Sequence, residues 1–502
     1  MKKETSAAVA EIYLVNADTP AELFQKTGAG RPTREELHHA ATRLKDEKSH
    51  TFFPLPVPHF ICFAPTEKNL SLAERLEKIR STAADVVTVL RTEKCFEAEI
   101  IDTTWQNDEE VLAFMEGLYL ADYHFDEFKK KKERAFRFSF RSLVVSEAQV
   151  ARVEALCEEV KRARRLIDLP FSALNAAQLA DAARETASKS GIKVEVWSEA
   201  RLRQSGMGGL LGVNQGSIDK PSFTEMEYKP AKAVNKKPIV LVGKGIVFDA
   251  GGMNIKTGSY MDEMKTDMAG AAVVMGVVRA VAALKLPVYV KALMPATDNR
   301  LNGNAMVCGD ILNMYDGTTV EVVNTDAEGR LILADAVAYG CKNFDPELVV
   351  TVATLTGAAS RALGSQGIAA MQENADRYTE SLLQAGARTH ERLCFFPMWN
   401  EYEKELASKV ADLKNCGSGS AGMITAAKFI KHFAGECPFV HLDVAGVEYL
   451  SKRDGYRGPG ATAYGLRLLV EFLREYAENG GLEKARSSKN KKAWRKKFIA
   501  VP

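Results

Sequence analysis

Acidic side chains and amines alternate with glycines in a segment near the middle of this 502-residue chain, Val242 to Ala272. An apolar run there is interrupted at Lys244 and continues to Asp249, and Lys256 and Asp267 follow further along. Polar side chains that directly follow buried strands collect at one edge of a sheet, where clefts form. The segment therefore predicts a polar site at strand ends.

A second segment, Val322 to Ala336, brings two carboxylates and a guanidinium close together in sequence. One residue separates Asp326 from Glu328, and Arg330 follows at the same spacing. If this stretch is extended, side chains at i and i+2 leave the same face, so both carboxylates point into one site.

Carboxylates that share a cleft need a positive partner, because like charges repel strongly where the dielectric constant is low. Divalent metal ions are the usual partner, and since neither segment contains a histidine, the ligands would be hard oxygen atoms. A lysine nitrogen can join them only where the metal keeps that amine neutral. Two ions roughly 3.5 to 4 Å apart, sharing a carboxylate and a hydroxide, generate a nucleophile at neutral pH. Lys256 and Arg330 then remain as cations that can meet negative charge developing on a carbonyl oxygen.

The same residues also have a simpler interpretation. An aspartate after a strand, such as Asp249, or before a helix, such as Asp267, is commonly a turn former or a helix cap. Gly251, Gly252 and Gly329 can serve only to permit tight turns. Spacing alone leaves both the metal site and the structural role open.

Two longer motifs resemble the signatures of a known family. VGKGIVFDAGG at Val242 to Gly252 and NTDAEGRL at Asn324 to Leu331 are similar to the hallmarks of the cytosol (leucyl) aminopeptidase family. ATLTGA at Ala353 to Ala358 and HLDVAG at His441 to Gly446 extend the resemblance, which covers residues 168 to about 476. The residues before this region match mainly in size and position.

The resemblance implies a role for each charged residue. The family's metal ligands fall, without substitution, on Lys244, Asp249, Asp267, Asp326 and Glu328. Asp249 and Glu328 are expected to bridge two ions. Lys244 with Asp267 would complete the tighter site, and Asp326 would complete the looser one.

Two cations complete the implied site. Lys256 and Arg330 correspond to the catalytic residues of the family, and Arg330 is expected to hold a bicarbonate ion, helped by backbone amides near Leu355 and Gly357. The implied reaction is removal of N-terminal residues from peptides, with attack by a water that bridges the metals and proton transfer by bicarbonate. The two ions are expected to be Zn or Mn, with Mg or Co as alternatives.

The resemblance also implies a pocket for the side chain of the residue removed, lined by Met264, Thr354, Gly357 and Ala445. Such an apolar lining favours leucine or other apolar residues. Glu448 departs from the family pattern, since many relatives have an apolar or aromatic residue there, and it makes the edge of the pocket more polar. Three further departures concern no implied ligand: Ala250, Cys308 and Thr351, where Ser, Pro and Asp are frequent.

Two other functions are open from the residues alone. Acidic metal pairs also serve phosphoester hydrolysis, although the lysine ligand and the lack of histidines in both segments disfavour it. Basic runs at Lys129–Lys132 and Lys484–Lys497 would suit a nucleic-acid-binding or scaffolding protein, but a solvated surface is the commoner explanation of such runs. The formal charge of +2 gives no general preference for nucleic acid or membrane. The expected partners are therefore peptides.

The length of the chain predicts two domains, and the alternation of strands with helices predicts the α/β class. Residues 1–145 are expected to form a smaller N-terminal α/β domain, and residues 146–167 have the periodicity of an amphipathic connecting helix. Residues 168–480 predict a catalytic domain with a mostly parallel central sheet covered by helices, and residues 481–502 form a basic tail.

Short apolar runs predict the individual strands, and periodic stretches predict the helices. Strands are expected at Phe60–Phe63, Val86–Leu90, Phe138–Val145, Val194–Trp197, Ile239–Phe248, Val288–Leu293, Val320–Val323, Leu348–Val352 and Val440–Leu442. Helices are expected at Ser71–Arg80 and Ala269–Ala283.

The eight cysteines include no CxxC pair, which favours reduced thiols. Met1–Ala10 lacks the continuous apolar core of a signal peptide, so a soluble cytoplasmic protein is expected. The resemblance implies a homohexamer.

Overall fold

The computed structural model describes residues 9–16, 32–43, 50–54, 58–65, 69–102, 105, 107–142, 144–187 and 191–481. By its internal contacts the chain divides into unit 1, Met1–Lys161 with Tyr449–Thr462, and unit 2, Arg162–Glu448 with Ala463–Pro502. Both units combine helices and sheets, which confirms the predicted α/β class with a smaller amino-terminal part. The domain boundaries predicted at residues 145, 167 and 480 stay predictions, and the basic tail lies outside the described residues.

Unit 1 is built on a five-stranded sheet with the order β2-β3-β1-β4-β5. Its strands are β1 (Ala10–Val15), β2 (His50–Phe53), β3 (His59–Phe63), β4 (Glu97–Asp102) and β5 (Arg137–Arg141). β2 pairs antiparallel with β3, and the other pairs are parallel. Every residue of β3 is buried, as expected for a strand covered on both faces.

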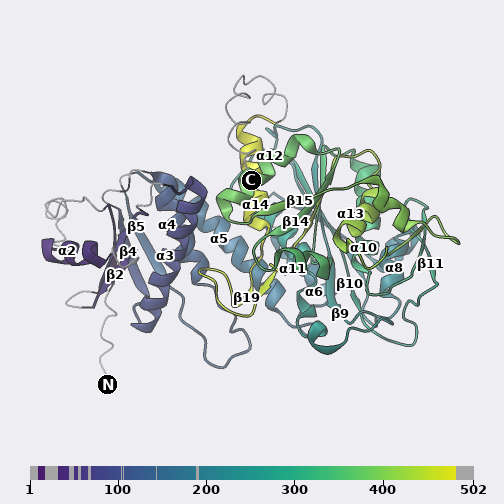
Figure 1. Cartoon of the computed structure of the whole chain (residues 1–502), viewed down its shortest axis with the longest axis horizontal. Coiled ribbons are helices and arrows are strands. Elements are labelled where there is room, and N and C mark those ends of the chain that lie inside the picture. Colours follow the sequence, from purple (N-terminus) through teal and green to yellow (C-terminus); the bar gives the residue numbers. More distant parts are fainter. Residues whose placement is uncertain are drawn as a thin grey trace. The chain divides into compact units, whose positions relative to one another are not determined.

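Two long helices, α3 (Leu72–Thr92) and α4 (Asp108–Ala121), lie side by side against this sheet, and α2 (Arg34–Arg43) lies on its other side (Figure 1). Ser71 begins α3 with a capping box, because its hydroxyl accepts from the N–H of Glu74 while that carboxylate accepts from the N–H of Ser71. The strand predicted at Val86–Leu90 is wrong. This apolar run continues the buried face of α3.

A single helix, α5 (Glu147–Asp168), continues from unit 1 into unit 2. Its start is fixed by Ser146 and Gln149, whose side chains each accept a hydrogen bond from the other's backbone N–H. A helix is therefore present where one was predicted for residues 146–167, and its role as a linker between domains stays a prediction.

Unit 2 contains a nine-stranded sheet with the order β15-β14-β17-β13-β8-β10-β7-β6, and β9 also pairs with β10. Its strands are β6 (Lys193–Trp197), β7 (Ser222–Tyr228), β8 (Ile239–Gly243), β9 (Gly245–Asp249), β10 (Val290–Asn299), β13 (Leu348–Ala353), β14 (Ile368–Glu373), β15 (Leu393–Phe396) and β17 (Phe439–Asp443). The central strands β17, β13, β8 and β10 are parallel, whereas β14 and β7 are antiparallel to their inner neighbours. The carboxyl ends of the central strands therefore share one edge of the sheet, where ligand sites form in such folds.

Helices cover both faces of this sheet. They are α6 (Ala176–Ala187), α7 (Glu199–Ser205), α8 (Gly208–Asn214), α9 (Ala269–Ala283), α10 (Gly329–Phe344), α11 (Gly357–Leu363), α12 (Asp376–Thr389), α13 (Gly422–His432) and α14 (Leu466–Glu478). In Figure 1, α8, α10 and α13 lie on the same side of the sheet, around a buried cluster that includes Trp197, Leu331 and Phe429. α9 packs on the strands β8, β10 and β13, and it also contacts α14.

Smaller elements complete the two units. Unit 2 has a sheet of β11 (Ile311–Asn313), β12 (Thr319–Glu321) and β16 (Leu413–Lys414), with 3-10 turns η2 (Gly258–Met261), η3 (Met264–Thr266) and η4 (Asn400–Leu406). In unit 1, β18 (Tyr449–Leu450) pairs with β19 (Gly460–Ala461).

The helix α9 is made almost entirely of alanine, glycine and valine, so it can approach the sheet closely. A carbon added at Gly270 would lie 2.0 Å from the carbonyl oxygen of Val352 on β13. Gly258–Ala283 has the length and apolar composition of a membrane-crossing helix, but 94% of its most apolar stretch is buried inside the structure. That burial is what a core helix of a folded unit shows, so this feature gives no membrane assignment.

The remaining predicted elements are largely confirmed. Strands at Val194–Trp197, Leu348–Val352 and Val440–Leu442 and the helix at Ala269–Ala283 are present, and the others have shifted ends. The run Ile239–Phe248, predicted as one strand, forms the two strands β8 and β9, which are separated at Lys244.

Candidate functional site

Lys244 is placed by the break between β8 and β9. Its backbone N–H donates to the carbonyl of Val352 on β13, and its carbonyl accepts from the N–H of Ala271 at the start of α9. The side chain is buried, and Nζ lies 2.7 Å from Oδ2 of Asp267 and 2.9 Å from Oε1 of Glu328. The strand break therefore directs an amine into a buried acidic site.

Asp249 is the last residue of β9, and its two oxygens face different partners. Oδ1 accepts from the backbone N–H of Gly251 at 2.9 Å and from Nδ2 of Asn299 at 2.8 Å. Oδ2 lies 2.7 Å from Nζ of Lys256. Gly251 has a φ of +88°, and a carbon added there would lie 3.1 Å from Oδ1 of Asp326, so the turn needs glycine. One oxygen of Asp249 is thus fixed by the backbone and the other faces the site.

Asp267 follows the turn η3 and precedes α9. Its Oδ1 accepts from Nζ of Lys244 at 2.8 Å and from the hydroxyl of Thr354 at 2.7 Å. The carbonyl of Thr354 accepts from Nζ of Lys244 at 3.0 Å. Thr354, at the carboxyl end of β13, therefore contacts both of these predicted ligands.

The stretch from Asp326 to Glu328 is not extended, so the strand geometry considered in the sequence analysis is wrong. Asp326 lies in a turn, and Glu328 has helical dihedral angles and is the residue before α10. The helix begins here because Asn415 binds the turn: its Nδ2 donates to the carbonyl of Asn324 at 2.7 Å and its Oδ1 accepts from the N–H of Val323 at 2.9 Å.

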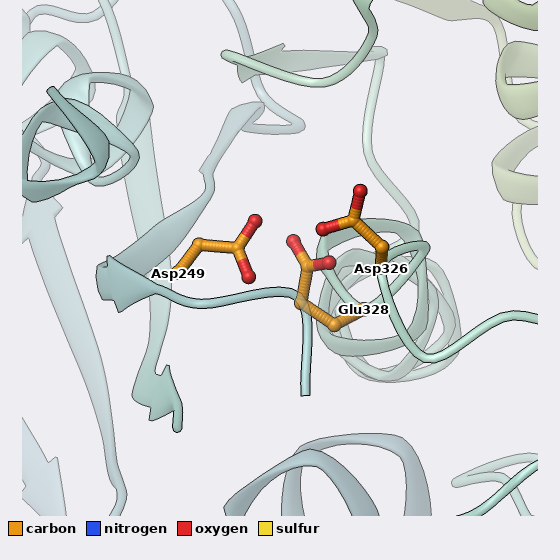
Figure 2. Close-up of side chains that lie close together, drawn as sticks. All are labelled: Asp249, Asp326 and Glu328. Atoms are coloured by element: carbon orange, nitrogen blue, oxygen red, sulfur yellow. The ribbon is translucent and has the colours of Figure 1, made fainter. Parts of the chain in front are cut away.

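The turn nevertheless brings the two carboxylates to Asp249. Ligand oxygens of Asp249, Asp326 and Glu328 all lie within 4.8 Å of one another. Figure 2 shows these carboxylates turned toward a common centre, with Asp249 at the end of its strand and the other two beside α10. This is the cluster expected of a metal site.

The five predicted ligands and Lys256 form two sets of ion pairs, Lys244 with Asp267 and Glu328, and Lys256 with Asp249 and Asp326, which meet where the carboxylates of Asp249, Asp326 and Glu328 converge. Besides its contact with Asp249, Nζ of Lys256 lies 2.5 Å from Oδ1 of Asp326. Four carboxylates thus face two amines, which leaves an excess of two negative charges when every group is ionised.

Burial and mutual repulsion shift the pKa values of these groups. Burial raises the pKa of Asp249 to about 6, helped by Glu328 and opposed by Lys256. Burial likewise raises the pKa of Asp267 well above its ordinary value and, to a lesser degree, that of Asp326. Burial also opposes the charge of Glu328, but the lysines outweigh it and lower the pKa of this carboxyl.

The two lysines respond in the opposite sense. Burial favours loss of the proton from Lys244 and Lys256, yet the surrounding carboxylates raise the pKa of both amines. In the described structure they are therefore ammonium groups that lie between the acids. A divalent ion would satisfy the same carboxylates, since it carries the charge that they lack.

Arg330 lies in the first turn of α10 and is buried. Its Nη1 donates to the carbonyl of Asn415 at 3.1 Å, whereas Nε, also buried, donates to no acceptor in the part of the chain that the structure describes. Burial lowers the pKa of this guanidinium. Arg330 thus has donor capacity left for an anion.

The residues predicted to bind substrate lie around two loops that follow β13 and β17. Thr354, Leu355 and Gly357 belong to the first loop and the start of α11, and Ala445 belongs to the second. Met264 opens the turn η3 that leads to Asp267 and is half-buried. The binding roles of these residues stay predictions.

Several polar residues of the site were not singled out from the sequence. Asn299 donates to both Oδ1 of Asp249 and the carbonyl of Thr325, and Asn415 organises the turn before α10. The buried Asp443 accepts hydrogen bonds from both loops, and burial raises its pKa to about 6. The signal for Asp443 and Asn299 was present, because each is a polar residue that ends an apolar strand.

Comparisons with known proteins agree with this geometry. Residues 161–470 match the model of the cytosol aminopeptidase family, catalytic domain. A probable cytosol aminopeptidase of Chlorobium limicola is 42% identical over 383 residues, which are 73% of this chain and 75% of that protein. A probable cytosol aminopeptidase of a Geobacter species is 40% identical over 436 residues, 85% of this chain and 87% of that protein.

A solved structure, described as the bottromycin maturation enzyme BotP in complex with Mn, has the same fold, with a TM-score of 0.80 and 28% sequence identity. The match covers 94% of this chain and 100% of that one. The family match covers more than half of the chain, and the two relatives are well above 30% identical. The chain therefore belongs to the cytosol aminopeptidase family and is a peptide hydrolase of the aminopeptidase type.

Proposed function

We propose that this aminopeptidase binds two divalent ions through Lys244, Asp249, Asp267, Asp326 and Glu328. The observation that carries the proposal is the convergence of ligand oxygens of Asp249, Asp326 and Glu328 within 4.8 Å, at the carboxyl edge of the sheet.

The residues present fit divalent ions. Three of the four carboxylates, those of Asp249, Asp267 and Glu328, are buried. Oε2 of Glu328 accepts no hydrogen bond from the described residues, although buried oxygens normally have a partner. Carboxylate oxygens with one nitrogen suit Mn or Zn, with Mg or Co as alternatives. The structure of BotP is a complex with Mn, which supports manganese as the first ion to test.

Bound there, divalent ions supply Lewis-acid polarisation of a carbonyl and a water of lowered pKa. Lys256 would then be free of its acidic partners and would place its ammonium group beside the carbonyl oxygen of the scissile bond. Arg330, held by Asn415 through Nη1, has donors left to bind bicarbonate as the proton carrier. Gly357 opens α11 and contributes one of the first-turn amides, which lack intrahelical acceptors.

We further propose that the preferred substrates are peptides with N-terminal leucine or another apolar residue. Met264, Thr354, Gly357 and Ala445 would contact that side chain. Glu448 accepts from the N–H of Gly446 at 2.6 Å, so its carboxylate is tied to its own loop. This contact supports an apolar preference despite the acidic residue.

The family description and the relatives' names also support a cytoplasmic enzyme, and we propose a homohexamer that acts on peptides without a nucleic acid or membrane partner.

The test is turnover of a leucine anilide by the full chain before and after removal of metal. We expect chelation to abolish turnover and added Mn to restore it. Glu328→Ala should lower kcat/KM by at least a thousandfold without unfolding, since it removes one charge from an over-acidic cluster. Asp316→Ala, which changes an exposed acid in the turn between β11 and β12, is the matched control and should stay within twofold. Full turnover by Glu328→Ala, or hydrolysis of phosphoesters but not of anilides, would contradict the proposal.

A further inference from the structure

Asp443 ends β17 beside the loop that follows β13. The two strands are parallel, and Ala353 is the register partner of Asp443. The carboxylate is completely buried. A buried charge needs partners. Among the described residues, the hydrogen-bond donors to this carboxylate all belong to one of two loops.

The first loop, Thr354–Gly357, supplies three of the four hydrogen bonds. Oδ1 accepts from the N–H of Leu355 at 3.0 Å and from that of Thr356 at 3.4 Å, and Oδ2 accepts from the hydroxyl of Thr356 at 2.7 Å. The same hydroxyl accepts from the N–H of Ala359 at 3.2 Å, so that Asp443 is also linked to the first turn of α11.

The second loop, Val444–Glu448, supplies the fourth hydrogen bond. The N–H of Ala445 donates to Oδ1 of Asp443 at 3.2 Å. One carboxylate therefore binds both loops that contain residues predicted to contact the substrate.

The first loop is also bonded on its other side, to the predicted metal ligands. Thr354 donates its hydroxyl to Asp267, and its carbonyl accepts from Lys244. The loop is thus held between the metal ligands and Asp443. The position of this loop relative to Lys244 and Asp267 depends on both sets of bonds.

We propose that Asp443 is a positioning residue, which sets the two loops of the substrate pocket at a fixed place relative to the metal ligands. This inference rests on the proposed function, because the loops are named as a substrate pocket there. Asp443 makes no contact with the predicted ligands in the described structure, so it acts on substrate binding and not on metal binding.

The experiment compares the full-length wild type with Asp443→Asn, which preserves size but cannot accept all four hydrogen bonds. Hydrogen exchange of the peptide that contains Leu355 and Thr356 should become at least tenfold faster. KM for a leucine anilide at saturating Mn should rise about tenfold while kcat falls less than threefold. Calorimetric affinity for Mn should stay within twofold.

The matched control is Asp335→Asn on α10. Asp335 is also fully buried and accepts backbone N–H groups, among them those of Leu210 and Tyr315, both at 2.9 Å. The Asp335→Asn variant should keep both the hydrogen-exchange rate at Leu355 and the KM within twofold of the wild-type values. A KM that rises equally in this control would show that loss of any buried carboxylate has the effect, and would overturn the proposal.

Unchanged exchange and KM in folded Asp443→Asn would also overturn it, as would a loss of Mn affinity that matches the loss of substrate affinity. If Asp443→Asn does not fold, Thr356→Val removes only the hydroxyl contact, and an unchanged KM in that variant contradicts the proposal. A wild type that binds Mn but hydrolyses no aminoacyl anilide would refute the proposed function, whereas the exchange rates would still decide whether Asp443 holds the loops.

Discussion

The amine of Lys244 can reach Asp267 and Glu328 only because residue 329 is a glycine, which has no side chain. A carbon added at Gly329 would lie 2.3 Å from Cε and 2.7 Å from Nζ of Lys244. No rotamer change of the added methyl can relieve such a contact, so Lys244 itself would have to move.

We predict that Gly329→Ala lowers kcat by at least a hundredfold and weakens Mn binding, because it displaces one ligand. Gly340→Ala, on the same helix, is the control: its added carbon would lie 3.1 Å from Cδ1 of Leu293 and 3.4 Å from Cγ1 of Val240, both tips of apolar side chains. Steady-state kinetics and calorimetry check the pair. Equal activity of the two variants would contradict the assignment of Lys244.

The charged residues of the site could be predicted from the sequence, because two long motifs carry them. Asn299 could have been noticed as the polar end of an apolar strand. Asn415 could not, since an asparagine in a loop is usually a turn former and its partner is fixed only by the fold. The two asparagines bind backbone groups of the turn that contains Asp326, and no sequence pattern specifies those contacts.

The pair of strands β13 and β17 carries a pH-sensitive element. Thr351 and His441 are register partners, and the hydroxyl of Thr351 lies 2.7 Å from Nδ1 of the imidazole. Burial, together with the charge of Arg330, lowers the pKa of His441 from 6.5 to about 3. Between these values the unfolded chain binds a proton that the folded chain does not, so stability falls as the pH falls.

We predict that His441→Gln reduces the acid sensitivity of the protein. Denaturant unfolding of the wild type should show a loss of stability between pH 6.5 and pH 3 that is larger than in the variant, by up to about 1.4 kcal/mol per pH unit. His432→Gln, an exposed histidine of α13, is the control and should leave the slope unchanged. Identical slopes in wild type and His441→Gln would show that the imidazole is protonated in the fold.

At the level of elements, periodicity predicts long helices well and short apolar runs poorly. α5 and α9 are predicted with nearly their observed ends, since each has a long periodic or alanine-rich stretch. Val86–Leu90 is wrongly predicted as a strand because a run of only five residues fits either a strand or a helix. The earlier turns of α3, from Leu72 onward, show that the run continues a helix. The turn at Asp326 could not be predicted, because Asn415, far along the chain, sets its geometry.

At the scale of the whole molecule, the surface of unit 2 exposes several large apolar side chains. Ile218 is 81% exposed and Tyr260 is 75% exposed. Association would remove such residues from water.

We predict a homohexamer of about 330 kDa, six times the chain mass of 55.1 kDa, by light scattering coupled to size exclusion. If Ile218 or Tyr260 lies in a subunit interface, Ile218→Lys or Tyr260→Lys should shift the measured mass toward smaller assemblies. A stable monomer of the wild type at micromolar concentration would contradict this part of the proposal.

The proposed catalytic centre consists of two divalent ions held by five side chains of unit 2. Anomalous diffraction from crystals of the full chain grown with Mn tests it most directly. We expect two anomalous peaks within ligand distance of Lys244, Asp249, Asp267, Asp326 and Glu328, and their loss in crystals of Glu328→Ala. Crystals in which Lys244 and Lys256 remain paired with the carboxylates at millimolar Mn, with no peak between them, would contradict it.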